Sequence, residues 1–165
     1  MAVFDTLIRA LAWAGAALFA LAGAMLFYEV VARYFFNAPT IWAAELSQLA
    51  LIWGTLVAMP WCLAARRHIA VDALAVLLPD GLRRGTEAAA MLAVAAFAAI
   101  VTWYGGDIFA DSFVRGRTTG SMLDLPTWLA ELPVPLGFAL LFVQALVETR
   151  RALAGDYAAR GGGHE

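Results

Sequence analysis

The sequence contains few residues of the kinds that perform chemistry in proteins. Only 15% of the 165 residues are charged, all eleven basic residues are arginine, and there are two histidines and one cysteine, Cys62. A single cysteine excludes an intramolecular disulfide, and a net charge of −2 gives no basic surface for nucleic acid. There is no P-loop, HExxH motif or pair of cysteines. The sequence therefore predicts neither an enzyme nor a cofactor or metal site.

Apolar residues dominate the chain instead. They make up 63% of it, whereas soluble domains have about 45–50%. A chain of this length has too little interior to bury so much apolar surface in water. The composition predicts an integral membrane protein with one domain, residues 1–154, followed by a flexible cytoplasmic tail at 155–165.

Four apolar runs are long enough to cross a hydrocarbon core of about 30 Å, which takes about 20 helical residues. We expect an all-α fold with transmembrane helices at about 10–32, 45–65, 86–106 and 127–149. The first run continues without a charge to Tyr28, which favours an uncleaved helix over a signal peptide. The start of the fourth helix, before or after Glu131, is left open.

The segment between the second and third helices is too short and too interrupted to span the membrane. Asp72 and Pro79 break its apolar pattern, but apolar residues recur at helical spacing from Ile69 to Leu77. This pattern predicts a short amphipathic helix in the membrane interface.

Arginine placement predicts the orientation of the chain. With the N-terminus in the cytoplasm, eight arginines lie on the cytoplasmic side, and only Arg33, Arg115 and Arg117 lie on the other side. Cytoplasmic loops carry an excess of arginine and lysine. Both termini are therefore expected in the cytoplasm.

Small residues suggest where the helices approach one another. Alanine recurs at every fourth position in the first run, and the third run is richer still in alanine. Such stripes allow close contact between helix backbones. We predict a packing stripe formed by Ala12, Ala16, Ala20 and Ala24.

A polar corner separates the first two helices. Glu29 and Arg33 are four residues apart, the spacing of an ion pair on one helix face. Asn37 and Pro39 break the helix, and Asn37 or Thr40 is placed to cap the next one. The residues with a predicted structural or partner-contact role here are Glu29, Arg33, Asn37, Pro39, Trp42 (an interfacial anchor) and Glu45.

A second polar corner follows the second helix. His68 and Asp72 are four residues apart and can pair there, or Asp72 can cap the next segment. The other histidine lies in the tail, and the apolar runs lack the histidines that a membrane haem needs. We interpret His68 and Asp72 as structural or interfacial residues.

Together the two corners resemble a known family. RYFFNAPTIWAAEL at 33–46, then an apolar run and ARRHIAVD at 65–72, is similar to the small membrane subunit of tripartite ATP-independent periplasmic (TRAP) transporters. SMLDLPTWLAELPVPLG at 121–137, ahead of the last helix, also fits. The resemblance covers about residues 10–150. It departs at Ala44, where the family often has a second acid beside the position of Glu45.

The resemblance implies an auxiliary scaffold subunit of a sodium-coupled importer of organic acids or related solutes, in the bacterial inner membrane. Its partners would be the lipid bilayer, a large membrane transport subunit and a periplasmic solute-binding protein. Two alternatives stay open: a membrane anchor subunit of a respiratory complex, and a self-sufficient small transporter. The absence of charges near the middle of any run favours the scaffold.

Overall fold

A computed structural model describes residues 2–65 and 80–154, and its regular structure is helical. Four segments are long and apolar enough to cross a membrane. They confirm the predicted class, an all-α membrane protein with four spans. The helices are α1 (Ala2–Phe36), α2 (Trp42–Ala64), α4 (Asp80–Arg115), α5 (Trp128–Glu131) and α6 (Pro133–Ala154). The predicted interfacial helix, His68, Asp72 and the tail lie outside the described residues.

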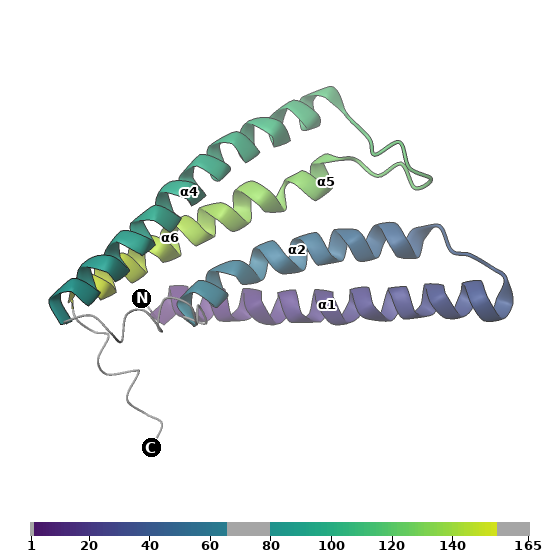
Figure 1. Ribbon diagram of the computed structural model, residues 1–165. Coiled ribbons are helices and arrows are strands. Elements are labelled where there is room, and N and C mark those ends of the chain that lie inside the picture. The colour runs from purple at the N-terminus through teal and green to yellow at the C-terminus, as the bar shows by residue number, and fades with distance from the viewer. Residues whose placement is uncertain (1, 66–79, 155–165) are drawn as a thin grey trace, which may run out of the picture.

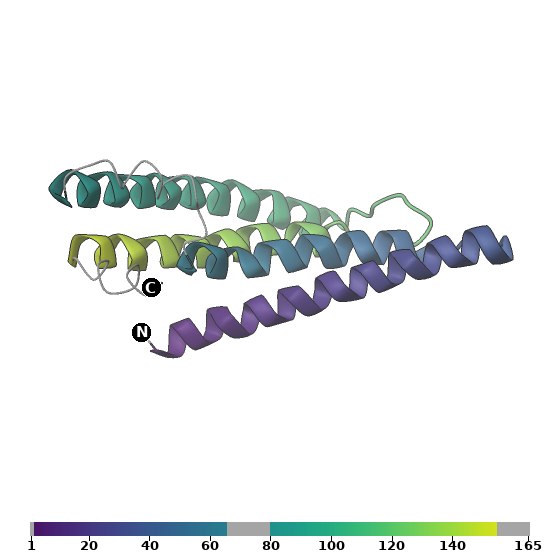
Figure 2. The ribbon, with the colours of Figure 1, turned by 60° about the horizontal axis from the view of Figure 1, so that its bottom comes forward.

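The long helices form an open row and not a closed bundle (Figures 1 and 2). Helix α1 packs on α2, α2 on α6, and α6 on α4, so α1 and α4 form the two edges. In the most apolar window of each span, 28% of the residues are buried in α2 and α6, against 11% in α1 and 17% in α4. Most apolar side chains therefore face outward, toward lipid or a partner.

The row consists of two helical pairs that diverge along its length. In Figure 1 the pair α1–α2 and the pair α4–α6 lie close together where the chain begins and α6 ends, and separate toward the other end. We call the end of the row where the two pairs lie close together the terminal end. The opposite end of the row, which holds the connections 37–41 and 116–127, is the corner end.

Helix α1 contacts α2 through residues spaced seven apart. Ile8, Ala22 and Glu29 are 2%, 0% and 6% exposed, and Gly15 between them is also buried. The predicted stripe is wrong as a packing face within this chain, because its members from Ala16 to Ala24 are exposed. A spacing of four drifts around a helix of 3.6 residues per turn, whereas a spacing of seven stays on one side.

Helix α2 has a close crossing on each of its sides. A Cβ added at Gly15 of α1 would lie 2.7 Å from the carbonyl oxygen of Gly54. On the other side, a Cβ at Gly137 of α6 would lie 2.7 Å from the carbonyl oxygen of Leu56. Glycine at these points lets the backbones approach, as small residues do in membrane helices.

Helix α4 extends beyond its predicted end at about residue 106. It continues to Arg115, through the start of the segment that we expected to be a connection. Arg115 Nε donates to Asp111 at 2.5 Å, and the rings of Phe109 and Phe113 stack with centroids 5.9 Å apart. These contacts between neighbours on a helix face carry the helix past its apolar run.

The fourth span begins before Glu131. It runs from Trp128 to Arg151, with α5 separated from α6 by Leu132 alone. Leu132 has helical backbone angles, φ −52° and ψ −43°, so the chain direction is maintained across the break.

Candidate functional site

The predicted pair at the first corner is present and has a third member. The Glu29 carboxylate accepts a hydrogen bond from Arg33 Nη2 at 2.6 Å. Its other oxygen accepts the backbone N–H of Thr40 at 2.9 Å and also the Thr40 hydroxyl. Because Thr40 comes just before α2, the acid at the end of one helix fixes the start of the next. The Glu29 side chain is 7% exposed, whereas Arg33 is 59% exposed.

Asn37 ends α1 and does not cap α2. Its φ of +49° places it in the left-handed region, and the N–H of Ala38 donates to the carbonyl of Ala32 at 3.1 Å. Helices commonly end at a residue in the left-handed conformation, a position that asparagine tolerates. The N-cap residue of α2 is Ile41, which makes no side-chain capping bond. The predicted caps of α2 are therefore wrong.

Pro39 and Trp42 complete this corner. Pro39 lies exposed in the turn between the helices. Trp42 opens α2 and stacks on Tyr28 of α1, with ring centroids 5.8 Å apart. The stacked pair joins the two helices.

Glu45 joins the two helical pairs at the corner end. One carboxylate oxygen accepts the Ser121 hydroxyl at 2.7 Å, and the other lies 3.5 Å from the backbone N–H of Leu123. Both belong to the connection between α4 and α5. The contact that the structure gives Glu45 is therefore within the chain.

A second bridge between the pairs was not predicted. The indole N–H of Trp53 donates to the carbonyl of Leu129 at 2.8 Å. That carbonyl would normally accept from the residue four places on, but this residue is Pro133, which has no N–H. The signal was present in the sequence as a proline inside the fourth span.

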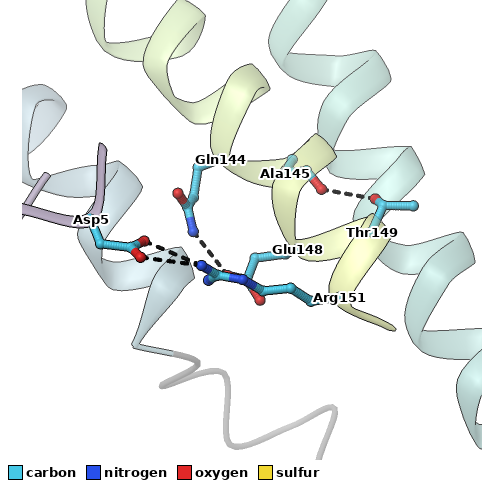
Figure 3. A network of polar contacts seen from close by, with 6 residues as sticks. All are labelled: Asp5, Gln144, Ala145, Glu148, Thr149 and Arg151. Atoms are coloured by element: carbon cyan, nitrogen blue, oxygen red, sulfur yellow. Dashed lines mark hydrogen bonds and ion pairs between the residues drawn. The ribbon is translucent and has the colours of Figure 1, made fainter. Parts of the chain in front are cut away.

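A buried polar network at the terminal end was also not predicted (Figure 3). Glu148 accepts a hydrogen bond from Gln144 Nε2 at 3.0 Å and from Arg151 Nη1 at 2.7 Å. Arg151 Nη2 lies 3.3 Å from both carboxylate oxygens of Asp5 in α1. Gln144 and Glu148 are 0% and 2% exposed. Gln144, Glu148 and Arg151 are spaced four and three residues apart on α6, which places them on one helix face. This spacing could have revealed the network.

These polar groups hold helices together. They lie at helix ends and breaks, and within the described ranges no three His, Cys, Asp or Glu side chains gather as metal ligands. The fold and site define a multi-pass membrane protein whose polar residues fix the geometry of an open helical row. Residues 22–155 match the family described as "Tripartite ATP-independent periplasmic transporters, DctQ component", and the chain belongs to this family.

A curated relative agrees with this assignment. "Sialic acid TRAP transporter permease protein SiaT" of Haemophilus influenzae (strain 86-028NP) is 25% identical to this chain over 123 residues. The aligned residues are 74% of this chain and 20% of that protein. The chain therefore matches about a fifth of the length of its relative. Membership in the family makes the protein a component of a transporter.

Proposed function

We propose that this protein is the scaffold subunit of a sodium-coupled importer of organic acids or related solutes in the bacterial inner membrane. It supports a large transport subunit, and a periplasmic solute-binding protein delivers the solute. Neither the solute nor the coupling ion binds to this chain.

The observation that carries the proposal is the open row of helices. Its edges, α1 and α4, leave apolar and small side chains uncovered, and the polar groups described above serve contacts within the chain. Such a row offers wide faces to a partner but no central polar site for a solute. About four-fifths of the matched relative lies outside the aligned region, and we assign the transport machinery to a separate large subunit here.

Co-purification tests the proposal directly. An affinity tag on this chain is expected to retain a large multi-helix membrane protein, and uptake in proteoliposomes is expected only when both proteins and the solute-binding protein are present. Uptake by liposomes that contain this chain alone would contradict the scaffold role.

Substitutions at the corner separate assembly from transport. Arg33→Ala and Glu45→Ala are expected to lower uptake together with the yield of the complex, because both side chains make hydrogen bonds that shape the corner end of this chain. A fall in uptake with normal complex yield and normal docking of the binding protein would assign them a direct transport role instead.

We further propose that the corner end faces the periplasm and both termini face the cytoplasm. Met122 at the corner end is 80% exposed, and Leu153 at the terminal end is 66% exposed. Each is replaced in turn by cysteine (Met122→Cys or Leu153→Cys) in a Cys62→Ser background. A membrane-impermeant maleimide added to spheroplasts should label the first and not the second. The reverse pattern would invert the orientation.

A further inference from the structure

A cavity lies between the two helical pairs at the corner end. Its volume is about 160 Å³ and it is partly open. One wall is α2, from Glu45 to Ile52, and the other is the 116–127 connection together with α5. Beside Ile52, the helical pairs are joined by the hydrogen bond from Trp53 to the carbonyl of Leu129. We call this space the corner cavity.

The corner cavity changes from polar to apolar along its length. Glu45, Thr119 and Ser121 line one end, which we call the rim, with Gln48 one turn further along α2. The other end is formed by apolar side chains such as Ile52 and Leu129. Glu45 and Ile52 are seven residues apart on α2, which corresponds to about 10 Å along the helix axis. The gradient runs along the axis of α2, as the polarity of a lipid does from its headgroup to its acyl chains.

The carboxylate at the rim has no cationic partner among the described residues. Glu45 accepts only neutral donors, the Ser121 hydroxyl and the Leu123 N–H. The arginines of the corner end pair elsewhere, Arg33 with Glu29, and Arg115 and Arg117 with Asp111. A carboxylate in the membrane interface is stabilised by a donor with positive charge.

We propose that the corner cavity binds a phospholipid with a primary-amine headgroup, phosphatidylethanolamine in a bacterial membrane. The ammonium group donates to Glu45 at the rim, and the first methylenes of one acyl chain lie against Ile52 and Leu129. A cavity of about 150 Å³ holds a benzene molecule, so the corner cavity holds only part of the lipid and the remainder lies in the bilayer. A free metal ion does not fit this site, because the end opposite the rim offers apolar groups.

Lipid retention tests this assignment on the full-length chain. The protein is incorporated into nanodiscs with equal amounts of phosphatidylethanolamine and phosphatidylglycerol, extracted, and washed in detergent, and the retained lipids are identified by native mass spectrometry. We expect one phosphatidylethanolamine per chain and no retained phosphatidylglycerol. Equal retention of the two lipids would overturn the recognition of the amine.

Two variants with matched controls locate the site. Glu45→Gln keeps an acceptor for Ser121 but removes the charge, and is expected to lower retention about tenfold. Ala130→Leu fills the cavity from α5 and is expected to abolish retention. Asp107→Asn and Ala110→Leu change exposed residues of α4 at the same end and should retain the lipid. Retention unchanged in both cavity variants would refute the site.

The result is independent of the scaffold role. The experiment needs neither the large subunit nor transport, so its failure leaves the scaffold proposal standing, and failure of co-purification leaves the lipid site standing. Should Glu45→Gln fold poorly, Ala130→Leu decides alone, because it leaves every described hydrogen bond of the rim intact.

Discussion

At the residue scale, the bond between Trp53 and Leu129 shows how a proline is accommodated in this membrane helix. Pro133 removes the N–H that would serve the Leu129 carbonyl. A side chain from the neighbouring helix supplies the donor at 2.8 Å. The same bond joins the two helical pairs, so one indole satisfies a backbone group and fixes a helix contact.

Trp53→Phe isolates this bond. The variant keeps an aromatic ring and loses the donor, so the free energy of unfolding should fall by about 1 kcal/mol. Thermal and denaturant unfolding of the purified protein in detergent measure the change. Trp13→Phe is the control, since Trp13 is 74% exposed and should lose nothing; an equal loss in the two variants would contradict the role of the bond.

The residues of the corner were predictable in part. The Glu29–Arg33 pair follows from helical spacing alone, so the sequence revealed it. The contacts from Glu29 to Thr40 and from Glu45 to Ser121 join residues 11 and 76 positions apart. They depend on how the chain turns, which local patterns do not determine. For the same reason the contact of Glu45 with the connection between α4 and α5 was not predicted from the sequence.

At the element scale, glycine determines how close α2 lies to both of its neighbours. Gly15 and Gly137 each leave no room for a Cβ beside a backbone carbonyl of α2. Gly23, on the same helix as Gly15, has nothing within 4 Å of the position a Cβ would take. Two glycines are thus required by packing, and the third is not.

Alanine substitutions distinguish these glycines. Gly15→Ala and Gly137→Ala force backbones apart, and each should lower the free energy of unfolding by about 1–3 kcal/mol. Gly23→Ala should leave it unchanged or raise it by up to about 1 kcal/mol, because alanine favours a helix. Unfolding in detergent provides the measurement. A Gly15→Ala protein as stable as Gly23→Ala would show that the crossing relaxes at no cost.

Hydropathy predicted the spans because the cost of exposing polar groups to lipid is large and additive along a helix. Helix ends and packing faces were predicted less well. The extension of α4 to Arg115 depends on side-chain contacts beyond the apolar run. The alanine stripe of α1 failed because alanine is frequent everywhere in this chain, so its spacing carries little information about which face is covered.

At the scale of the whole molecule, the two helical pairs are connected at both ends of the row. Glu45 bridges them at the corner end and Trp53 at the middle of α2. At the terminal end, Arg151 bridges α6 to Asp5 of α1. Helices α1 and α6 do not pack on each other in the described part of the chain. The ion pair between Arg151 and Asp5 is thus a long-range link between separate helices.

Removal of the Arg151 guanidinium tests this link. Arg151→Met removes the ion pair that the Arg151 guanidinium makes with the buried Glu148 carboxylate, and should lower the free energy of unfolding by about 1–3 kcal/mol. Asp5→Asn should cost less, because the Asp5 side chain is 41% exposed. Combining Arg151→Met with Glu148→Gln removes both charges and should recover most of the loss. A stable Arg151→Met protein would contradict a structural role for the network.

The order of helices in the row has a consequence for biogenesis. Two of its three contacts, α1 with α2 and α4 with α6, join membrane spans that follow each other in the chain, so each pair can form as soon as it leaves the translocon. The seam between α2 and α6 must wait until the last span has been synthesised. Until then the close-packing surface around Leu56 is uncovered in the bilayer, and a ribosome stalled before Gly137 would leave a separately folded first hairpin.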